Sequence, residues 1–356
     1  MKKIAIDLRC IAEPRAGKGN YAFHLVRNLI AQDQQNHYLL FLDQTDPEFS
    51  PSKNLQIHLL ETKSFMRHFE IAKICQQNAI DIFFSPSSYI TPSLIKKPTK
   101  IVFTVHDLVS FVADEGHNLK AKLIEKLFLR RAIAKATKIL TVSKNTQTDL
   151  TKLFPQSKDK AEIIYCAADT SFEANSKAKP AEYFLAVGTI QPRKNYINLL
   201  KAFEIFRRKN PNYKLMIIGQ NGWRSEHFFQ LLQESPSRKS IEILGHIDQK
   251  KLQQLYQNAT ALVFPSFYEG FGIPLLEAMN CACPVLCSQT SSIPEVVGDA
   301  AVFFNPHQPK EITAAMQKIT NNPLLRSQLI EAGLTQSEKF SWGKSAASLL
   351  ALFEKI

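Results

Sequence analysis

The sequence lacks the features that define several large classes of protein. No apolar run in its 356 residues reaches the length needed to span a bilayer. The first residues, MKKIAIDLRC, place basic residues before an apolar run. Asp7 and Arg9 interrupt that run, which predicts a first β-strand rather than a signal peptide. The dinucleotide fingerprint G-x-G-x-x-G is missing near the N-terminus, because Ala22 stands at its last position, so nothing indicates a nicotinamide enzyme.

Metal-binding patterns are also missing. No D-x-D pair, which would hold a divalent ion against a diphosphate, occurs in the chain. The cysteines are irregularly spread and contain no C-x2-C spacing, so we expect reduced, mostly buried thiols and no zinc site. They are Cys10, Cys75, Cys166, Cys281, Cys283 and Cys287. We therefore predict no metal cofactor, and the charge that holds an anionic ligand would come from the protein itself.

The composition is that of an ordinary globular protein with an excess of positive charge. Hydrophobic residues make up 45% and charged residues 21% of the chain, and its length predicts two domains. The net charge is +12. No recognition motif or basic strand interleaved with aromatics accompanies it, so we expect no nucleic-acid partner.

The positive charge has one local concentration, at 119–138. Leu119, Leu123, Leu127 and Ile133 recur there at near-helical spacing, which predicts a basic amphipathic helix with Glu125 as its one acidic residue. Such a helix either lies on anionic lipid headgroups or presents a solvated face above the core. Its basic residues are Lys120, Lys122, Lys126, Arg130, Arg131, Lys135 and Lys138.

Strand-like apolar runs alternate with helical patterns throughout, which predicts two doubly wound, parallel α/β sheets. The predicted strands are 3–9, 37–42, 80–84, 101–105, 138–142, 161–165, 183–188, 213–218, 241–244, 260–264, 284–288 and 301–304. The predicted helices are 19–32, 65–77, 119–136, 144–154, 195–209, 225–234, 248–258 and 273–281, followed by helices that begin at Pro309, at Pro323 and near Trp342. The polar stretch 169–182 reads as a linker, so the domains meet at 168/169.

The segment FPSFYEGFGIPLLEAM, at 264–279, carries the clearest chemical signal. Gly270 and Gly272 allow close approach of the backbone to a ligand, and Pro274 suits the first turn of a helix. The amides of 270–272 would then lie at the positive end of that helix, as an anion site. With Glu269 before the loop and Glu277 in the first turn, the segment suggests a ligand with anionic and hydroxyl groups, such as a sugar nucleotide. The alternative is an ordinary strand–loop–helix unit whose acids favour a helix N-terminus.

Polar residues follow other predicted strands. Arg193 and Lys194 come after strand 183–188 and suit a diphosphate, unless they form a solvated basic turn. His106 takes the equivalent place in the first domain, where it either meets a sugar hydroxyl or caps a strand. Gly17 and Gly19 follow the first strand and suggest a loop that a ligand can approach closely.

These motifs, in this order, resemble the family-4 retaining glycosyltransferases of the GT-B fold. The resemblance covers nearly the whole chain. It rests on Gly17–Gly19, HDL at 106–108, TVS at 141–143, GTIQPRKN at 188–195, LGHID at 244–248, PSFYEGFGIPLLEA at 265–278 with its E-x7-E pair, and SSIPEVVGDAAVFFNP at 291–306. The chain departs from the pattern at Cys283, usually a glycine, and at 166–169, where Cys-Ala-Ala-Asp replaces Asn-Gly-Val-Asp.

The resemblance implies two Rossmann-like domains facing a central cleft: 1–168 on the acceptor side and 169–341 for the donor. Helix 342–356 would pack back on the first domain. Arg193 and Lys194 would hold the donor diphosphate, and Glu277 the ribose. The site residues that it implies are His106 at the reaction centre, Glu269, Gly270, Phe271 and Gly272 at the transferred sugar, Gly17 and Gly19 on the donor side, and Gly245, His246 and Ile247 around the base.

The expected activity is transfer of a hexose, mannose from GDP-mannose in the first instance, to a glycan or lipid-linked acceptor of surface polysaccharide synthesis. UDP-glucose or UDP-N-acetylglucosamine as donor, and a non-catalytic sugar-nucleotide-binding protein, remain alternatives. We expect a cytoplasmic protein without a metal cofactor, peripheral on the inner face of the membrane if 119–138 docks there.

Overall fold

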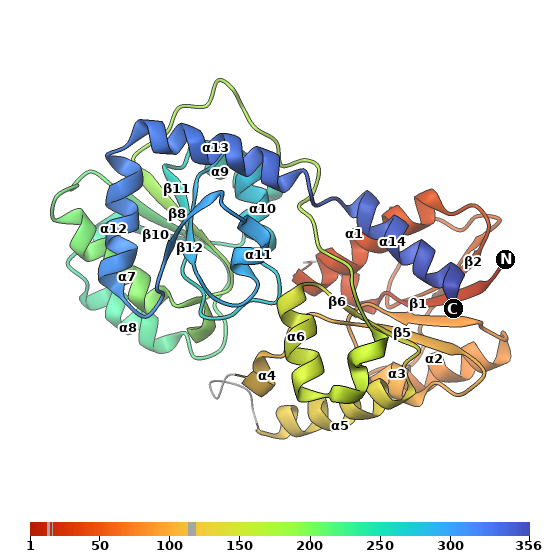
Figure 1. Ribbon diagram of the computed structural model, residues 1–356. Helices are drawn as coiled ribbons and strands as arrows, with labels where there is room; N and C mark the ends of the chain where they lie inside the picture. The colour runs from red at the N-terminus through yellow and green to blue at the C-terminus, as the bar shows by residue number, and fades with distance from the viewer. Residues whose placement is uncertain (13–14, 16, 113–118) are drawn as a thin grey trace. The chain divides into compact units, whose positions relative to one another are not determined.

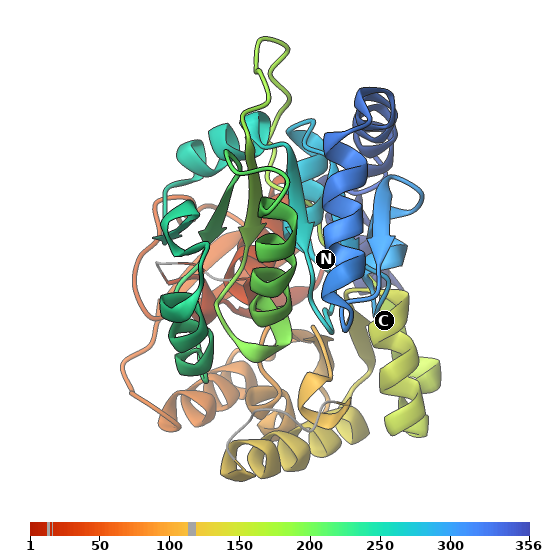
Figure 2. The same cartoon turned by 90° about the vertical axis from the view of Figure 1, so that its left-hand side faces the viewer.

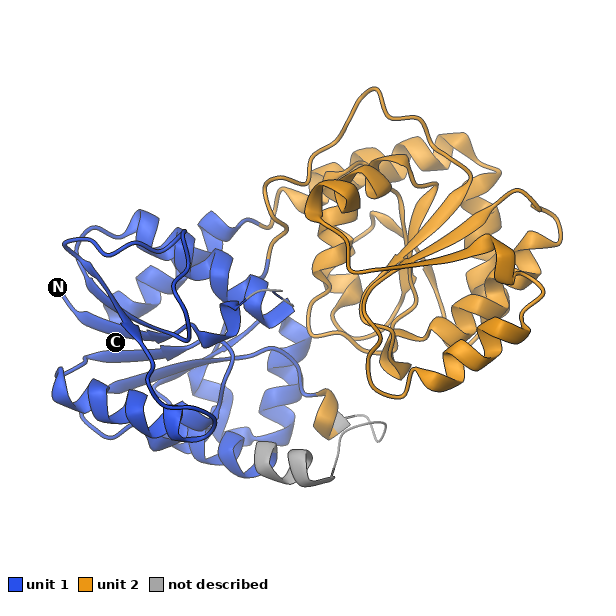
Figure 3. Cartoon of the chain, turned by 180° about the vertical axis from the view of Figure 1, so that it is seen from behind, with its two compact units in different colours: residues 1–108, 117–166, 341–356 blue, residues 109–116, 167–340 orange. Residues whose placement is uncertain are grey.

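A computed structural model describes residues 1–12, 15, 17–112 and 119–356, with no side chains described at 112 and 119–125. The chain divides into two compact units (Figure 3). Unit 1 combines Met1–Leu108, His117–Cys166 and Ser341–Ile356, and unit 2 consists of Ala167–Phe340 with a short piece that begins at Val109. The chain therefore leaves unit 1 and returns to it through its last helix.

The described part of unit 1 forms a seven-stranded parallel sheet in the order β3-β2-β1-β4-β5-β6-β7 (Figure 1). Its central strands are almost fully buried apolar runs, as expected for a sheet covered on both faces. The strands are β1 Lys3–Asp7, β2 His37–Leu42, β3 Leu55–Leu59, β4 Ile82–Ser85, β5 Lys100–Val105, β6 Lys138–Thr141 and β7 Ala161–Ile163.

The C-terminal helix of the chain belongs to unit 1, where it packs against α1 (Figure 1). Trp342 stacks on His24 with the ring centroids 5.5 Å apart, and Phe353 meets Phe84 edge to face. The helices of this unit are α1 Gly17–Gln32, α2 Met66–Gln77, α3 Ile90–Leu94, α5 Leu119–Lys135, α6 Lys144–Leu153 and α14 Trp342–Lys355, with 3-10 turns η1 Arg9–Ile11 and η2 Pro155–Lys160. A short helix, α4 Val109–Val112, precedes the segment outside the described residues.

Unit 2 is built on a parallel sheet of its own, with six strands in its described part and the order β10-β9-β8-β11-β12-β13. Its strands are β8 Tyr183–Val187, β9 Lys214–Ile218, β10 Ile241–Gly245, β11 Ala261–Phe264, β12 Val285–Ser288 and β13 Ala301–Phe304. Phe184, Phe203 and Phe206 lie in a large buried cluster between this sheet and α7. The core thus supplies a rigid base for the loops at the carboxyl edge.

Helices cover both faces of the second sheet, as Figures 1 and 2 show. On one face α7 contacts α8 and α12, and on the other α10 contacts α9 and α13. The helices are α7 Tyr196–Arg207, α8 Glu226–Glu234, α9 Gln249–Asn258, α10 Ile273–Asn280, α11 Ile293–Val297, α12 Pro309–Thr320 and α13 Pro323–Ser337, with η3 Pro192–Lys194 and η4 Arg238–Ser240. The predicted α/β class with two doubly wound, Rossmann-like sheets is confirmed.

Each sheet has a point at which its strand order reverses: between β1 and β4 in unit 1, and between β8 and β11 in unit 2. The connections that follow such a pair of strands run to opposite faces of the sheet and leave a crevice at its carboxyl edge, where α/β proteins bind ligands. The GTIQPRKN motif follows β8 and the PSFYEGFG motif follows β11. The second sheet therefore brings its two richest motifs to one switch point.

Some sequence-based expectations were wrong in detail. The prediction missed β3, which has only Leu55 fully buried and so shows no apolar run, and it missed the short helices α3, α4 and α11. Gly17 and Gly19 form the first turn of α1 rather than a loop. Glu277 lies beyond the first turn of α10, because that helix begins at Ile273. The side chains of Lys120, Lys122 and Glu125 in the predicted basic helix lie outside the described residues.

The predicted linker 169–182 lies along α9 rather than hanging free. The Gln249 and Gln253 amides donate hydrogen bonds to the Ser171 side chain and carbonyl at 2.6 and 2.7 Å. The Gln257 amide donates to the Glu173 carbonyl at 2.8 Å, and Phe172 meets Tyr256 edge to face. The start of this linker is therefore fixed to unit 2.

Candidate functional site

The candidate site lies in unit 2, where the connection after β8 meets the connection after β11. Asn195 holds the two together from a left-handed backbone conformation, with φ of 60°. Its side-chain amide donates to the carbonyl of Pro265, 3.0 Å away, and to that of Pro306, 2.7 Å away. The Phe267 amide also donates to the Arg193 carbonyl at 2.9 Å. One buried asparagine thus ties together the loops that follow three strands.

Arg193 and Lys194 converge on a single carboxylate. Arg193 Nη1 lies 2.6 Å from Glu269 Oε2 and donates to the Tyr268 carbonyl at 2.6 Å. Lys194 Nζ lies 2.6 Å from Glu269 Oε1. The Lys194 ammonium also lies 4.8 Å from the centroid of the Phe264 ring. We call Arg193, Lys194 and Glu269 the cation cluster; two positive charges against one negative charge leave it cationic.

The absence of a side chain at Gly188 leaves room for the side chain of Lys194. Gly188 follows β8 with φ of +143°, and a Cβ there would lie 3.0 Å from Lys194 Cε. Any other side chain would strain the backbone and press on the lysine stem. The lysine is 9% exposed, so its ammonium depends on the Glu269 carboxylate for compensation.

Glu269 is fixed by its own loop as well as by the cations. Its amide donates to Ser291 Oγ at 2.9 Å, and the carbonyls of Glu269 and Phe271 share the single proton of the Ser292 hydroxyl at 2.9 and 3.0 Å. Burial acts to raise the pKa of the Glu269 carboxyl, but Lys194 and Arg193 outweigh it and hold the pKa at about 2. The carboxylate is therefore ionised throughout the neutral range.

The loop leads directly into the N-terminus of α10. Gly272 is the residue before the helix and has φ of +110°, a conformation that side chains rarely adopt. A Cβ at that position would lie 2.8 Å from Leu275 Cδ1. The positive end of the helix dipole and the cation cluster thus reinforce each other at the loop formed by 270–272.

Glu277 is held separately, through α9. The Tyr256 hydroxyl donates to Glu277 Oε2 at 2.9 Å, and the tyrosine is fully buried. Burial raises the pKa of the Glu277 carboxyl to about 7; the Tyr256 hydrogen bond opposes this shift, and the Asp169 charge adds to it. A small change in surroundings therefore decides whether this carboxyl is ionised at neutral pH.

The predicted base-binding residues lie at the end of the sheet's edge strand. β10 ends at Gly245, which has φ of +64° and accepts a hydrogen bond from the Gly219 amide at 2.9 Å. His246 follows as an exposed residue, and Ile247 is half-buried. The structure places Gly245 to Ile247 on the same carboxyl edge as the cation cluster, with β9 and β8 between them.

The remaining predicted site residues belong to unit 1. His106 follows β5, is 9% exposed, and donates from Nε2 to the Pro86 carbonyl at 2.7 Å. Burial, with a contribution from the Lys18 charge, lowers the pKa of His106 to about 4, so the ring is neutral at pH 7. Gly19 packs so closely on η1 that a Cβ would lie 2.5 Å from the Cys10 carbonyl oxygen, whereas a Cβ on Gly17 would meet nothing within 4 Å.

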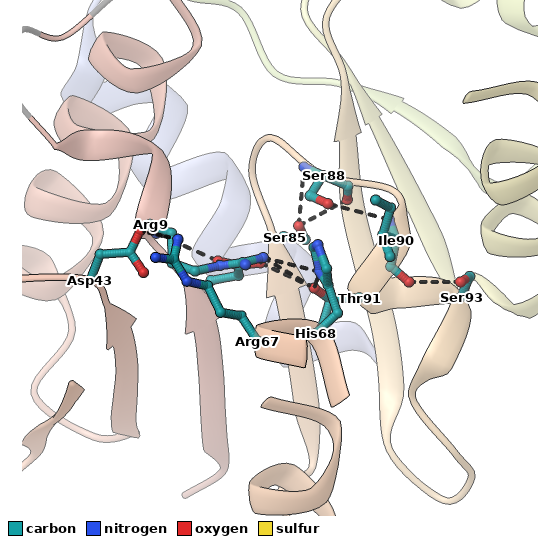
Figure 4. A network of polar contacts seen from close by, with 10 residues as sticks. Arg9, Asp43, Arg67, His68, Ser85, Ser88, Ile90, Thr91 and Ser93 are labelled. Atoms are coloured by element: carbon teal, nitrogen blue, oxygen red, sulfur yellow. Dashed lines mark hydrogen bonds and ion pairs between the residues drawn. The ribbon is translucent and has the colours of Figure 1, made fainter. Parts of the chain in front are cut away.

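Sequence reasoning missed a buried polar network beside the switch point of unit 1 (Figure 4). Arg9 pairs with both oxygens of Asp7 at 2.7 Å, and its guanidinium points toward His68 and Thr91. It donates to His68 Nδ1 at 3.1 Å, which requires an unprotonated Nδ1. Burial and then the Arg9 charge lower the pKa of His68 to about 4, in agreement with that role.

Tyr256 and Asn195 were also missed as parts of the site. Tyr256 lies on the same helical face as Leu252, four residues earlier, so the pattern suggests an ordinary core aromatic. Asn195 ends the PRKN motif, but only the structure shows its two carbonyl partners. Among the described residues, no group of His, Cys, Asp and Glu is arranged to hold a metal ion, and no helix is long and apolar enough to cross a membrane.

Comparison with known proteins identifies the family. The profile of the glycosyl transferases group 1 matches residues 168–336, and that of Glycosyltransferase Family 4 matches residues 16–172. O-antigen chain mannosyltransferase B of Escherichia coli is 30% identical over 96% of this chain and 96% of its own length. The chain belongs to the family-4 glycosyltransferases.

This family-4 glycosyltransferase is also similar to a second mannosyltransferase in sequence and to a solved structure in fold. O-antigen chain mannosyltransferase RfbU of Salmonella typhimurium is 29% identical over 62% of this chain and 61% of its own length. Among solved structures, Anabaena Alr3699/HepE in complex with UDP-glucose aligns over 100% of both chains with a TM-score of 0.80 at 13% identity. The predicted GT-B fold, the family resemblance and the hexosyltransferase class are thereby confirmed.

Proposed function

We propose that this family-4 glycosyltransferase transfers mannose from GDP-mannose to a glycan or lipid-linked acceptor in the synthesis of a surface polysaccharide. The observation that carries the proposal is the cation cluster at the N-terminus of α10, which suits a donor diphosphate. The mannosyltransferases among its relatives support the sugar and the O-antigen context.

In the proposed donor complex, Arg193 and Lys194 bind the diphosphate and Glu277 accepts hydrogen bonds from the ribose hydroxyls. Glu269 and the backbone of 270–272 contact the transferred sugar, and Gly245, His246 and Ile247 frame the base. In unit 1, Gly17 and Gly19 line the donor side, and His106 contacts the sugar through its unprotonated Nδ1. Since its Nε2 is committed to the Pro86 carbonyl, neutral His106 can accept a hydrogen bond from a hydroxyl.

The proposed reaction retains the configuration of the anomeric carbon. Positive charge develops on the sugar and negative charge on the leaving diphosphate as the glycosidic bond breaks, and Arg193, Lys194 and the loop amides stabilise the diphosphate. The acceptor hydroxyl attacks on the same face and passes its proton to the leaving phosphate. The protein's own cations supply the charge in this scheme, and we expect it to run without a divalent ion.

Other donors and roles are alternatives to this proposal. A UDP-glucose complex is known for the structural neighbour Alr3699/HepE, so UDP-glucose or UDP-N-acetylglucosamine is the alternative donor. A non-catalytic sugar-nucleotide-binding protein would bind donor without product. We further propose a cytoplasmic protein that is peripheral on the inner face of the membrane, through the cations of α5.

Nucleotide preference and transfer test the proposal together. Thermal stabilisation by GDP should exceed that by UDP, and incubation of GDP-mannose with a lipid-linked mannosyl acceptor should yield a product one hexose longer. Removal of one charge at a leaving group costs about 3 kcal/mol, so Lys194→Ala should slow single-turnover transfer by about two orders of magnitude. Lys201→Ala, an exposed lysine on α7, is the matched control. An unchanged rate and donor affinity in Lys194→Ala would rule out the assigned role.

A further inference from the structure

Unit 2 contains a cavity beside the cation cluster. It has a volume of about 420 Å³ and lies between the β8–α7 connection, the start of α8 and Phe267. Ile190, Tyr196 and Phe228 form its buried apolar floor. Its size and mixed lining are those of a small-molecule site.

This cavity is distinct from the proposed donor site. Gln191 and Pro192 form part of its wall, whereas the side chains of Arg193 and Lys194, the next residues, turn to Glu269. None of the residues assigned to the donor lines the cavity. The 3-10 turn η3 therefore separates two sites and presents different residues to each.

The polar groups of the cavity are planar and available. Gln191, Arg224 and His227 line it, and none of these side chains has a hydrogen-bond partner among the described residues. Asn198 uses its amide nitrogen on the Pro306 carbonyl at 3.0 Å, which leaves its oxygen as an acceptor. Among the residues that the structure describes, no carboxylate lines the cavity, and its fixed charge comes from Arg224.

An aromatic face completes the lining. Phe267 enters the cavity wall and stacks on His307 with centroids 4.7 Å apart, which fixes the plane of its ring. A flat aromatic surface packs against the C–H face of a sugar ring, while amide, imidazole and guanidinium groups bind its hydroxyls. The cavity offers a phosphate only the charge of Arg224, whereas the cation cluster offers the charges of Arg193 and Lys194, so the cavity is less suited to phosphate.

We propose that this cavity binds one or two sugar units of the glycan that the enzyme extends or has just extended, away from the reacting hydroxyl. The inference rests on the proposed function, because a glycan acceptor is part of it. A second binding site for the acceptor glycan would favour long acceptors over short ones. It would add affinity for the acceptor without entering the chemical step.

Oligosaccharide binding to the full chain tests this site. The probes are α-linked mannotetraose and the glucose oligomer maltotetraose, titrated by calorimetry in parallel with GDP and UDP. The variants are Arg224→Ala/His227→Ala, both exposed positions, and Phe267→Leu, with Lys239→Ala as an exposed cation of the same unit outside the cavity. Loss of two hydrogen bonds should weaken binding of the preferred tetrasaccharide about tenfold or more. Nucleotide affinity should stay within about twofold in every variant.

With active enzyme, the double variant should raise KM for long acceptors and leave both kcat and KM for a disaccharide acceptor unchanged. Failure of wild-type protein to bind either tetrasaccharide, or equal binding by wild type and double variant, would overturn the inference. Cavity-dependent binding without any sugar transfer would keep the inference and refute the proposed function. Sugar transfer together with tetrasaccharide binding that does not depend on the cavity would support the proposed function and refute the inference.

Discussion

The Tyr256 hydroxyl donates a hydrogen bond to the Glu277 carboxyl across 2.9 Å, from α9 to α10. This bond stabilises the carboxylate, because an acid that accepts a hydrogen bond in its charged form loses its proton more readily. Burial pulls the other way and keeps the pKa of Glu277 at about 7. Tyr256 therefore positions the carboxyl and also sets how far it is ionised near neutral pH.

Donor affinity should consequently depend on pH. A ribose hydroxyl forms a stronger hydrogen bond to the carboxylate than to the neutral acid, so binding of a nucleoside diphosphate should strengthen as pH rises through about 7. Removing the Tyr256 bond raises the pKa of Glu277 further, so Tyr256→Phe should move the midpoint to higher pH. Calorimetric titration with GDP between about pH 6 and 8 measures the midpoint. A midpoint that stays in place would show that Tyr256 does not act through Glu277, and Glu277→Gln should lose the pH dependence.

The raised pKa of Glu277 also determines the direction in which protein stability changes with pH. The Glu277 pKa in the folded protein lies above its ordinary value of 4.5, so the folded state binds more protons than the unfolded state between the two values. This contribution is fully present below about pH 4.5 and is lost as pH rises through about 7. Glu269 has the opposite sign, because its pKa is lowered to about 2: its contribution is present above pH 4.5 and is lost as pH falls toward 2.

Glu269→Gln should destabilise the protein and increase its dependence on bound diphosphate. The substitution leaves the buried Lys194 ammonium without its carboxylate, and breaking a buried pair costs about 3 kcal/mol. A diphosphate can replace the missing negative charge, so GDP should raise the melting temperature of the variant more than that of wild type. Urea unfolding with and without GDP measures both effects. Equal stability of variant and wild type would show that Glu269 is not needed to compensate the cations.

Substitutions of Asn195 should separate backbone strain from hydrogen bonding. Asn195→Gly tolerates the left-handed conformation and loses both side-chain bonds, at a cost of about 2 kcal/mol. Asn195→Ala loses the same bonds and adds about 1 kcal/mol for its Cβ in that conformation. Urea denaturation gives the two costs, and both variants should bind GDP more weakly because the loops after β8 and β11 are no longer joined. A smaller cost for alanine than for glycine would show that the left-handed backbone at residue 195 imposes no strain on a side chain.

Charge on α5 should decide attachment to membranes. Lys126, Arg130 and Arg131 are exposed, and Leu127 beside them is 63% exposed. Each cation near an anionic bilayer contributes about 1 kcal/mol, so Arg130→Glu/Arg131→Glu should weaken binding to anionic vesicles by at least about tenfold. Sedimentation with anionic and with neutral vesicles measures this, and Arg208→Glu/Lys209→Glu on unit 2 is the matched control. Equal binding by both double variants would contradict a specific role for α5.

The sequence predicted the architecture well because buried parallel strands are continuous apolar runs. Every strand of the second sheet was found within a residue or two, and its central strands β8, β11 and β12 are fully or almost fully buried. The prediction missed β3 because it is an edge strand in which only Leu55 is buried, so it lacks a continuous apolar run. The prediction missed short helices such as α11 because five residues are too few to show a helical repeat of apolar residues.

The sequence singled out several charged residues of the candidate site but not their contacts. Arg193 and Lys194 were predicted because they follow an apolar strand at its carboxyl end, where α/β proteins bind ligands. Glu269 and Glu277 were predicted from the motif that follows β11. No pattern could show that Glu269 pairs with both cations while Glu277 pairs with Tyr256. These pairings depend on which loops follow neighbouring strands, and that order is a property of the folded sheet.

The return of the chain through α14 means that unit 1 is not a continuous stretch of sequence. Phe353 and Leu349 are fully buried in its core, and the Lys2 ammonium donates to the Phe353 carbonyl at 2.6 Å. A protein made without its last sixteen residues would lack part of the wall against which the first helix packs. During synthesis the interior of unit 1 can therefore close only after the ribosome has added α14, about 175 residues after Cys166, where the preceding part of that unit ends.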